Sequence, residues 1–438
     1  MTWLRDVLLF VFLLVVMALW VMLPWPGAVL LALLLAAWLL ATRRGRQALS
    51  VANVGISTLR QRLGATAVIV VGIAGVVGVL VALLSMADGY AETLRKTGGT
   101  DTAIVMRGAS SAEVASVLDR DSATLIQQAP GIARNANGEP IASSELVVAA
   151  NLPIRGGAPG EEGSVQLRGI AEQAWAVRPQ VRIVAGKRFT PGLRELVVGR
   201  GAARQFAGLE PGSQVRLGSQ QWAVVGVFAS GDAMESEIWA DANVVADTYR
   251  RGSGRASVTV RLTDPQAFGA FKAALESNPQ LKVDASTTLD YFSKQSERVT
   301  QVLRIIGITV GTIMAIGAMF GALNTMFAAV AARAREIATL RAIGFPGLPV
   351  VVAVLLETML LALAGGLIGG LLAYLIFNGY GASTMAAGSV GKLSFDLRVS
   401  PELLWTGLKW ALAIGFIGGL FPAVRAARLP VTTALREL

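Results

Sequence analysis

Residues 333–345 read RAREIATLRAIGF and lie between two long apolar stretches, 300–332 and 348–378, each of which carries a single charged residue. Charged side chains in the hydrocarbon core of a bilayer carry a large free-energy penalty. The run therefore cannot continue either apolar stretch across a membrane. It predicts a short amphipathic helix that joins two transmembrane helices at one membrane face.

The composition agrees with a membrane protein. Hydrophobic residues make up 53% of the 438 residues, and the mean hydropathy is +0.57. Apolar stretches of about 17–25 residues are long enough to span a bilayer as helices. Six stretches qualify, and they are 3–23, 26–42, 65–86, 300–332, 348–378 and 402–422. The sequence thus predicts an α-helical polytopic membrane protein with six transmembrane helices, an N-terminal hairpin plus a core of four.

The charges orient these spans. Acidic and basic residues cancel over 87–300, so the formal net charge of +10 belongs to the membrane-associated part. Segment 43–64 holds five arginines and no acid. Because loops rich in lysine and arginine stay in the cytoplasm, we expect this segment, run 333–345 and both termini there. The large segment 87–298, between the third and fourth spans, is then periplasmic.

Several function classes are disfavoured. The chain has no histidine and no cysteine, which removes the commonest general base and the usual soft metal ligands, so no catalytic residue and no metal site are predicted. The arginines fringe apolar spans, which argues against nucleic-acid binding. Gly199-Arg-Gly201 lacks the third glycine of a dinucleotide fingerprint, and Ala386 and Leu393 replace the glycine and the Ser/Thr of a phosphate loop.

Run 333–345 resembles the "REI-x-x-LRA-hydrophobic-G" signature of the FtsX/MacB-type ABC transporter permeases, also called type VII or mechanotransmission exporters. The resemblance implies that the helix couples to a cytosolic ATPase through the signature residues, which are Arg335, Glu336, Leu340, Arg341, Gly344 and Phe345. It implies a dimer of ABC ATPase subunits that bind ATP and Mg, with no cofactor in this chain. It also implies a second permease copy or paralogue in a bacterial inner membrane, with a periplasmic membrane-fusion adaptor and membrane lipid as further candidate partners.

A second resemblance covers 195–228, which is similar to the strand and turn pattern of the MacB-type periplasmic core domain. The segment 87–298 predicts an α+β domain in which 111–128 is helical. Its predicted strands are 102–106, 145–149, 164–168, 195–199, 213–217 and 221–228, with the second pairing the third and the fifth pairing the sixth.

The N-terminal hairpin, 1–46, departs from the family's four-helix pattern. Its two helices lack glycine ridges, so we expect them at the periphery, where they either clasp a partner's membrane helix or enlarge the bundle. Segment 47–64 follows as an amphipathic elbow helix in the inner headgroup plane, with apolar residues on one face and arginines opposite. The third span, 65–86, comes next.

The fourth span carries glycines four residues apart, Gly307 with Gly311 and Gly317 with Gly321. Such pairs let helices approach closely. They predict packing within the bundle or against a second permease. Glu357 is an acid deep in the fifth span, which is a functional hypothesis by default. Since the spans supply no further titratable groups for a proton relay, a structural role is favoured.

The region 299–438 holds the last three spans and coupling segment 333–345. Helical periodicity runs without proline from 288 to 332, a helix of roughly 68 Å at ~1.5 Å per residue, about twice the hydrocarbon core. The excess predicts a stalk, supported by 88–95, that either transmits motion or only anchors the domain. The predicted function is a permease that carries ATP-driven motion to the periplasmic domain and exports or extracts a lipoprotein, lipid, peptide or drug. The alternative is an FtsX-like transmitter that regulates an extracytoplasmic partner without transport.

Overall fold

The structure is a computed structural model that describes residues 15, 19–57, 59, 62–385 and 391–428. The chain falls into two compact units. The helical unit comprises Met1–Ser85, Leu303–Asn378 and Arg398–Leu438, and the sheet unit comprises Met86–Val302 and Gly379–Leu397.

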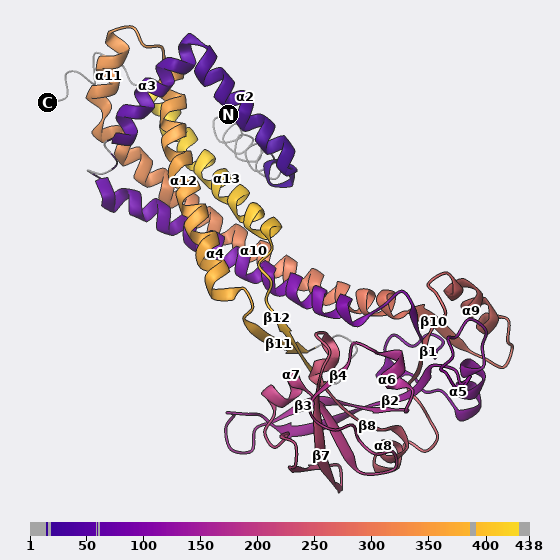
Figure 1. The fold of residues 1–438 in the computed structure, drawn as a ribbon. Helices are drawn as coiled ribbons and strands as arrows, with labels where there is room; N and C mark the ends of the chain where they lie inside the picture. The colour runs from indigo at the N-terminus through magenta and orange to yellow at the C-terminus, as the bar shows by residue number, and fades with distance from the viewer. Residues whose placement is uncertain (1–14, 16–18, 58, 60–61, 386–390, 429–438) are drawn as a thin grey trace, which may run out of the picture. The chain divides into compact units, whose positions relative to one another are not determined.

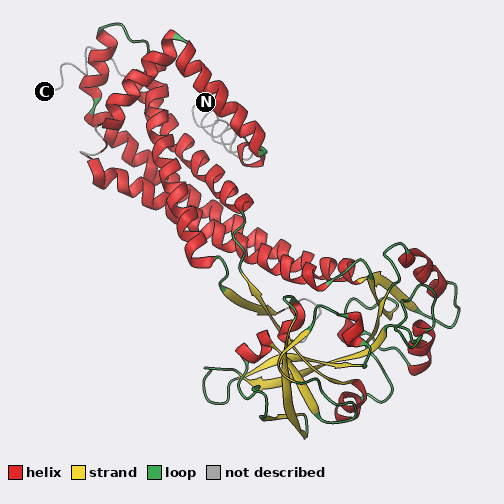
Figure 2. Cartoon of the chain, in the orientation of Figure 1, coloured by secondary structure: helices red, strands yellow, loops and turns green. Residues whose placement is uncertain are grey.

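Seven named helices and a helical stretch at 19–22 lie wholly or partly in the described residues of the helical unit. Figures 1 and 2 show how they are arranged. The named helices are α2 (Trp25–Ala41), α3 (Arg43–Ser57), α4 (Leu63–Thr97), α10 (Thr288–Ala332), α11 (Ala334–Ala342), α12 (Gly347–Phe377) and α13 (Pro401–Arg428). In the part of the chain that is described, α4, α10, α12 and α13 are long and apolar enough to cross a membrane. The predicted four-helix core is therefore present. The count of six spans is not confirmed, because 3–23 lies largely outside the described residues and α2 qualifies as a span only when it is taken together with α3 as one bent pair.

Small residues bring the core helices together. The core is built from α4, α10, α12 and α13, with Leu80, Met319 and Ile414 among its buried side chains. A Cβ atom at Gly369 would lie 2.4 Å from the backbone oxygen of Ala74, so only glycine permits this approach of α12 to α4.

Helix α2 has only two buried residues, Ala28 and Leu39, as expected for a peripheral helix. A bend of 95° separates it from α3. The predicted elbow is present as α3, but its start differs from the predicted boundary at 46/47, because the Gly45 N–H donates to Thr42 Oγ1 (2.9 Å) and the helix begins at Arg43. Residues 58, 60 and 61 of the predicted elbow 47–64 lie outside the described residues.

The chain just before α2 is tied to α13. Lys409, which is 8% exposed, donates from Nζ to the backbone oxygens of Val21 and Leu23, and Trp20 Nε1 donates to the Lys409 oxygen (2.9 Å). These bonds satisfy carbonyls that the end of a helix leaves without partners.

The sheet unit is an α+β fold with a ten-stranded sheet of order β10-β1-β9-β2-β3-β8-β5-β7-β4, with β6 paired to β7. The strands are β1 (Thr102–Arg107), β2 (Ala142–Pro153), β3 (Glu162–Ile170), β4 (Arg182–Gly186), β5 (Glu195–Gly199), β6 (Gln214–Leu217), β7 (Gln220–Ala229), β8 (Glu237–Asp241), β9 (Ser257–Arg261) and β10 (Val283–Thr287). Short helices pack beside them, namely η2 (Glu113–Ala115), α5 (Arg120–Gln127), α6 (Ala174–Val177), α7 (Arg200–Gln205), η3 (Ala233–Ser236), α8 (Ala242–Thr248) and α9 (Ala267–Glu276).

All six predicted strands are present, and β2 pairs with β3 and β6 with β7 as expected. The predicted helix 111–128 is wrong over its first half. Asp119 Oδ1 accepts from the Ser122 N–H (2.7 Å), and this N-cap starts the helix only at Arg120.

The loop between the last two spans also differs from expectation. Residues 379–397 belong to the sheet unit and form a hairpin of β11 (Gly381–Met385) and β12 (Lys392–Asp396), so this unit is not confined to 87–298. The Ser394 N–H donates to Ser236 Oγ (2.8 Å), and Phe395 meets Tyr90 edge-on at 5.6 Å. Lys392 thus opens a strand rather than the helix that a phosphate loop requires.

Candidate functional site

The coupling segment forms helix α11, which is separated from α10 by the single residue Arg333. Gly344, with φ +102°, ends the segment in a left-handed turn that favours glycine. The predicted short helix between two spans is present.

The signature residues of segment 333–345 divide between an exposed side and a side that packs on this chain. Arg335 and Glu336 are exposed, and their contact with a partner stays a prediction. Leu340 and Phe345 are half-buried and pack on a small apolar cluster of this chain, formed by Val51, Ala52, Ala353 and Leu356. These two residues fasten the helix to α3 and α12, whereas Arg335 and Glu336 point away. Arg341 is half-buried.

Glu357 lies in α12 and is only 5% exposed. Its Oε2 accepts from Nη1 of Arg333 at 3.0 Å, and Nε of Arg333 also reaches Glu336 Oε2 at 3.3 Å. The intramembrane acid is thus paired with a guanidinium, which makes the buried charge tolerable. Arg333 stood in the quoted run but was not among the predicted site residues. The signal that could have found it is a single acid in one span and an arginine at the border of the preceding span.

The two glycine pairs of α10 lie in different surroundings. Gly307 and Gly311 are buried against α4, where their Cβ atoms would meet Leu83 (3.3 Å) and Leu80 (2.7 Å). Cβ atoms at Gly317 and Gly321 would meet nothing within 4 Å among the described residues. Packing inside the chain therefore uses the first pair. Contact with a second permease remains a prediction for the other two.

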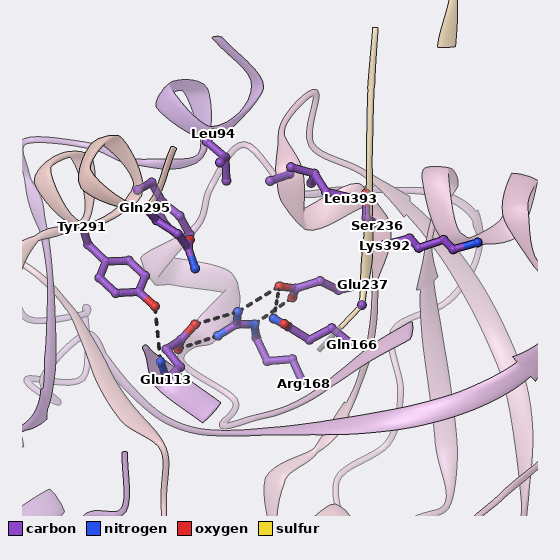
Figure 3. Close-up of a pocket in the computed structure, with 13 residues that line it drawn as sticks. Leu94, Glu113, Gln166, Arg168, Ser236, Glu237, Tyr291, Gln295, Lys392 and Leu393 are labelled. Atoms are coloured by element: carbon purple, nitrogen blue, oxygen red, sulfur yellow. Dashed lines mark hydrogen bonds and ion pairs between the residues drawn. The ribbon is translucent and has the colours of Figure 1, made fainter. Parts of the chain in front are cut away.

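The sheet unit contains a buried charge cluster that the sequence did not predict. Arg168, 1% exposed, lies between Glu113 and Glu237 (Figure 3). It donates five hydrogen bonds of 2.7–3.0 Å to Glu113, Glu145 and Glu237. Arg178 adds a pair of bonds to Glu145, at 2.5 and 2.8 Å. The five side chains, Glu113, Glu145, Arg168, Arg178 and Glu237, are called the Arg168 cluster below.

The two arginines of the cluster lower the pKa of Glu145. Burial by itself would raise the pKa of Glu145, but the neighbouring Arg178 and Arg168 outweigh it and hold that pKa below the ordinary value. Asp232 lies nearby, and burial raises the pKa of its carboxyl, opposed by hydrogen bonds from Ser230 and the Met234 N–H and reinforced by Glu237.

Figure 3 shows Tyr291 of α10 pointing at η2, where its Oη accepts from the Glu113 N–H at 3.3 Å. A cavity of about 40 Å³ adjoins these residues, lined also by Leu94 of α4 and by β12. It has room for a few waters only, since each needs ~10–15 Å³. Among the described residues no group of three or more His, Cys, Asp or Glu could hold a metal ion. The arrangement joins a helix to a sheet.

Comparisons with known proteins agree with both resemblances. A model of the MacB-like periplasmic core domain matches residues 64–278, and a model of the FtsX-like permease C-terminal region matches residues 308–431. Together they cover more than half of the chain. The chain belongs to the FtsX/MacB-type ABC transporter permeases.

The relatives of this permease are distant. The macrolide export ATP-binding/permease protein MacB of Bordetella avium is 26% identical over 428 residues, which cover 92% of this chain and 62% of that protein. The uncharacterized ABC transporter permease YknZ of Bacillus subtilis is 25% identical over 292 residues, 63% of this chain and 71% of that protein. The permease thus spans less than two thirds of the Bordetella relative, whose name also includes ATP binding.

Among solved structures, the periplasmic region of MacB from Actinobacillus actinomycetemcomitans matches 48% of this chain and 96% of its own, with 16% identity and a TM-score of 0.34. From family membership and its apolar helices, the permease is an inner-membrane protein with an extracytoplasmic domain, and the matched range 64–278 places that domain in the sheet unit.

Proposed function

We propose that this permease carries ATP-driven motion from a cytosolic ABC ATPase dimer to its extracytoplasmic sheet unit. The observation that supports this most directly is α10, a single helix of 45 residues, Thr288–Ala332. It begins directly after strand β10 of the sheet unit and ends one residue before α11. A continuous helix is a stiff connection, so a displacement at its cytosolic end is passed along its length.

Helix α11 is the docking surface in this proposal. Arg335 and Glu336 face outward, where they would meet charged groups of the ATPase, while Leu340 and Phe345 hold the helix to its own unit. ATP and Mg would bind to the ATPase. A pair of ATPase subunits needs two such helices, so two permeases assemble, with the open glycines Gly317 and Gly321 available for the contact.

At the other end, the sheet unit receives the motion through residues at the start of α10. Tyr291 bonds η2, and Thr288 Oγ1 accepts from the Gly99 N–H (2.8 Å), directly after α4. The output we favour is export or extraction of a lipoprotein, lipid, peptide or drug from the outer leaflet or periplasm. If ATP moves the sheet unit but no cargo leaves the membrane, the permease is a signal transmitter instead.

A spin-label experiment tests the transmission. This chain has no cysteine, so Ser219→Cys, at the exposed β6–β7 turn, gives one labelling site in each permease. In the complex purified from its own organism's membranes, the distance between the labels of two permeases is measured with and without ATP, Mg and vanadate. We expect the distance distribution to shift on nucleotide trapping.

The matched variants are Arg335→Glu on α11 and Arg216→Glu, which changes another exposed arginine, on β6. Loss of a polar contact to a partner costs about 1–3 kcal/mol. Arg335→Glu should therefore reduce ATPase retention and abolish the shift, and Arg216→Glu should do neither. Wild-type retention and shift in Arg335→Glu would reject the proposal, as would one permease per two ATPases by native mass measurement.

A further inference from the structure

We propose that Arg333 is the positioning residue of the coupling helix, because its guanidinium ties α11 to the buried carboxylate of Glu357. This two-branched contact of Arg333 is called the fork below. This inference rests on the proposed function, in which α11 receives the force of the ATPase. It adds that docking and transmission are separable, since Arg335 and Glu336 bind the ATPase and Arg333 directs the helix that they belong to.

The backbone gives Arg333 a special place. Helix α10 ends at Ala332 and α11 begins at Ala334, and Arg333 between them has φ −107° and ψ 13°, outside the helical range. The non-helical backbone between α10 and α11 is therefore confined to one residue. If that residue were free to rotate, force on α11 would bend the joint rather than move α10.

The side chain removes this freedom. Arg333 Nη1 donates to Glu357 at 3.0 Å, and Nε donates to Glu336 at 3.3 Å, so one rigid planar group holds both the next span and the first turn of α11. The side chains of Arg333 and Glu357 are only 10% and 7% exposed, whereas that of Glu336 is 56% exposed. The buried bond is thus shielded from water and salt, and the exposed one is open to exchange with a partner's cation.

Helix α3 packs against the Arg333–Glu357 pair, as a third element beside α11 and α12. A Cβ atom at Gly55 would lie 2.8 Å from Glu357 Oε2 and 3.0 Å from Arg333 Nη1, so the backbone of α3 sits directly on the ion pair. One turn earlier, Val51 and Ala52 of the same helix pack in the cluster that holds Leu340. Helices α3, α11 and α12 are therefore fixed to one another by an ion pair and an apolar cluster together.

Docking and transmission would therefore depend on different residues of segment 333–345. When an ATPase engages Glu336, the Arg333–Glu357 bond persists and keeps α11 rigid on α12, so displacement passes into α10. Without that bond, α11 still presents Arg335 and Glu336, but it turns about residue 333 and the displacement is lost.

Single substitutions test the fork in the Ser219→Cys complex. Arg333→Gln and Glu357→Gln should each retain the ATPase and its KM for ATP, while the fraction of complexes with the shifted distance falls roughly tenfold (about 1.4 kcal/mol). Arg333→Lys keeps one charged contact to Glu357 and should restore most of the shift. The double variant should be no worse than either single one, because both remove the same pair.

A steric variant keeps every charge. Gly55→Ala inserts a methyl group against the ion pair, and Gly64→Ala is its control, since a Cβ atom at Gly64 meets nothing within 4 Å among the described residues. We expect Gly55→Ala to reduce the shift and Gly64→Ala to leave it unchanged. Thermal unfolding of each purified complex separates this loss from misfolding.

The outcomes distinguish failure of the inference about Arg333 from failure of the proposed function. A wild-type shift in Arg333→Gln, Glu357→Gln and Gly55→Ala, with the shift lost in Arg335→Glu, would overturn the fork and leave the coupling helix intact. Loss of the ATPase from Arg333→Gln, or an Arg333→Lys variant as defective as Arg333→Gln, would also overturn it. If Arg335→Glu behaves as wild type too, the proposed function itself is wrong.

Discussion

The two units treat buried charge in different ways. In the sheet unit, Arg168 donates five hydrogen bonds to three glutamates, and Arg178 shares one of these acids. In the helical unit, Arg333 donates one bond to a buried acid and one to an exposed acid. Redundant bonds hold several strands in one arrangement, whereas a fork with one exposed branch is suited to a joint that a partner can act on. Under the proposed function, the sheet unit would be the rigid part that receives the motion, and the coupling helix would be the adjustable part on which the ATPase acts.

The largest effect should come from Arg168→Met, because it leaves Glu113 and Glu237 buried without a guanidinium and leaves Glu145 with Arg178 alone. Breaking a buried pair in this way costs about 3–5 kcal/mol. Faster hydrogen exchange in β3 and β8 of the purified full-length permease would report the loss. Arg155→Met is the control: it breaks an exposed pair with Glu210 (2.6 Å), worth about 0–1 kcal/mol. Equal hydrogen exchange in the two variants would show that the buried cluster contributes no more to stability than the exposed pair.

A smaller effect is expected for Tyr291→Phe. The hydroxyl accepts from the buried Glu113 N–H, and an orphaned buried donor costs about 1–3 kcal/mol. Exchange at that amide and at the start of α10 should increase together. Tyr380→Phe, which changes a 63% exposed tyrosine of the same unit, should change nothing. Unchanged exchange in Tyr291→Phe would show that α10 does not depend on this bond.

Replacing both members of the Arg333–Glu357 pair tests the comparison of the two units further. Arg333→Met with Glu357→Met leaves no unpaired charge, and apolar replacement of a buried pair is often neutral or stabilising. We expect the thermal unfolding midpoint to change by no more than about 2–4 °C while nucleotide no longer shifts the distance between labels. A double variant that fails to fold would make this pair as structural as the Arg168 cluster.

The smallest effect concerns pH. Because burial raises the pKa of Asp232, the folded state holds this proton more tightly than the unfolded chain, and the carboxyl lowers stability as pH rises through its folded pKa. Asp232→Asn should remove that decline and flatten the dependence of the unfolding midpoint on pH above 3.8, the ordinary value. Glu145, with its lowered pKa, acts in the opposite direction and loses its contribution as pH falls. An unchanged pH profile in Asp232→Asn would show that its carboxyl is not strained by burial.

Local signals were sufficient for much of this fold. Helix α10 was predicted with both ends because its periodicity is uninterrupted and no proline breaks it, and β2–β3 followed from alternation and a glycine-rich turn. The coupling helix was predicted from charge between two spans. These are properties of neighbouring residues.

The remainder depends on residues distant in sequence. Glu113, Glu145 and Glu237 look scattered until the sheet brings them to Arg168, and Arg333 meets Glu357 only when α12 folds back. The hairpin β11–β12 was missed for the same reason, since its partner Ser236 is separated from Ser394 by 158 positions. No periodicity within either segment reports such a pairing.

That hairpin has a consequence for biosynthesis. The sheet unit takes its last two strands from 379–397, so it is completed only after α12 has been made. The 76 residues from Leu303 to Asn378 take roughly 4–15 s to synthesise at ~5–20 residues per second. During that interval, Tyr90 has not yet made its contact with Phe395, and the hydroxyl of Ser236 has not yet accepted its bond from the hairpin. Maturation of the sheet unit is therefore timed by insertion of the spans, and a chain that stalls in the membrane leaves this surface uncovered for chaperones or proteases to recognise.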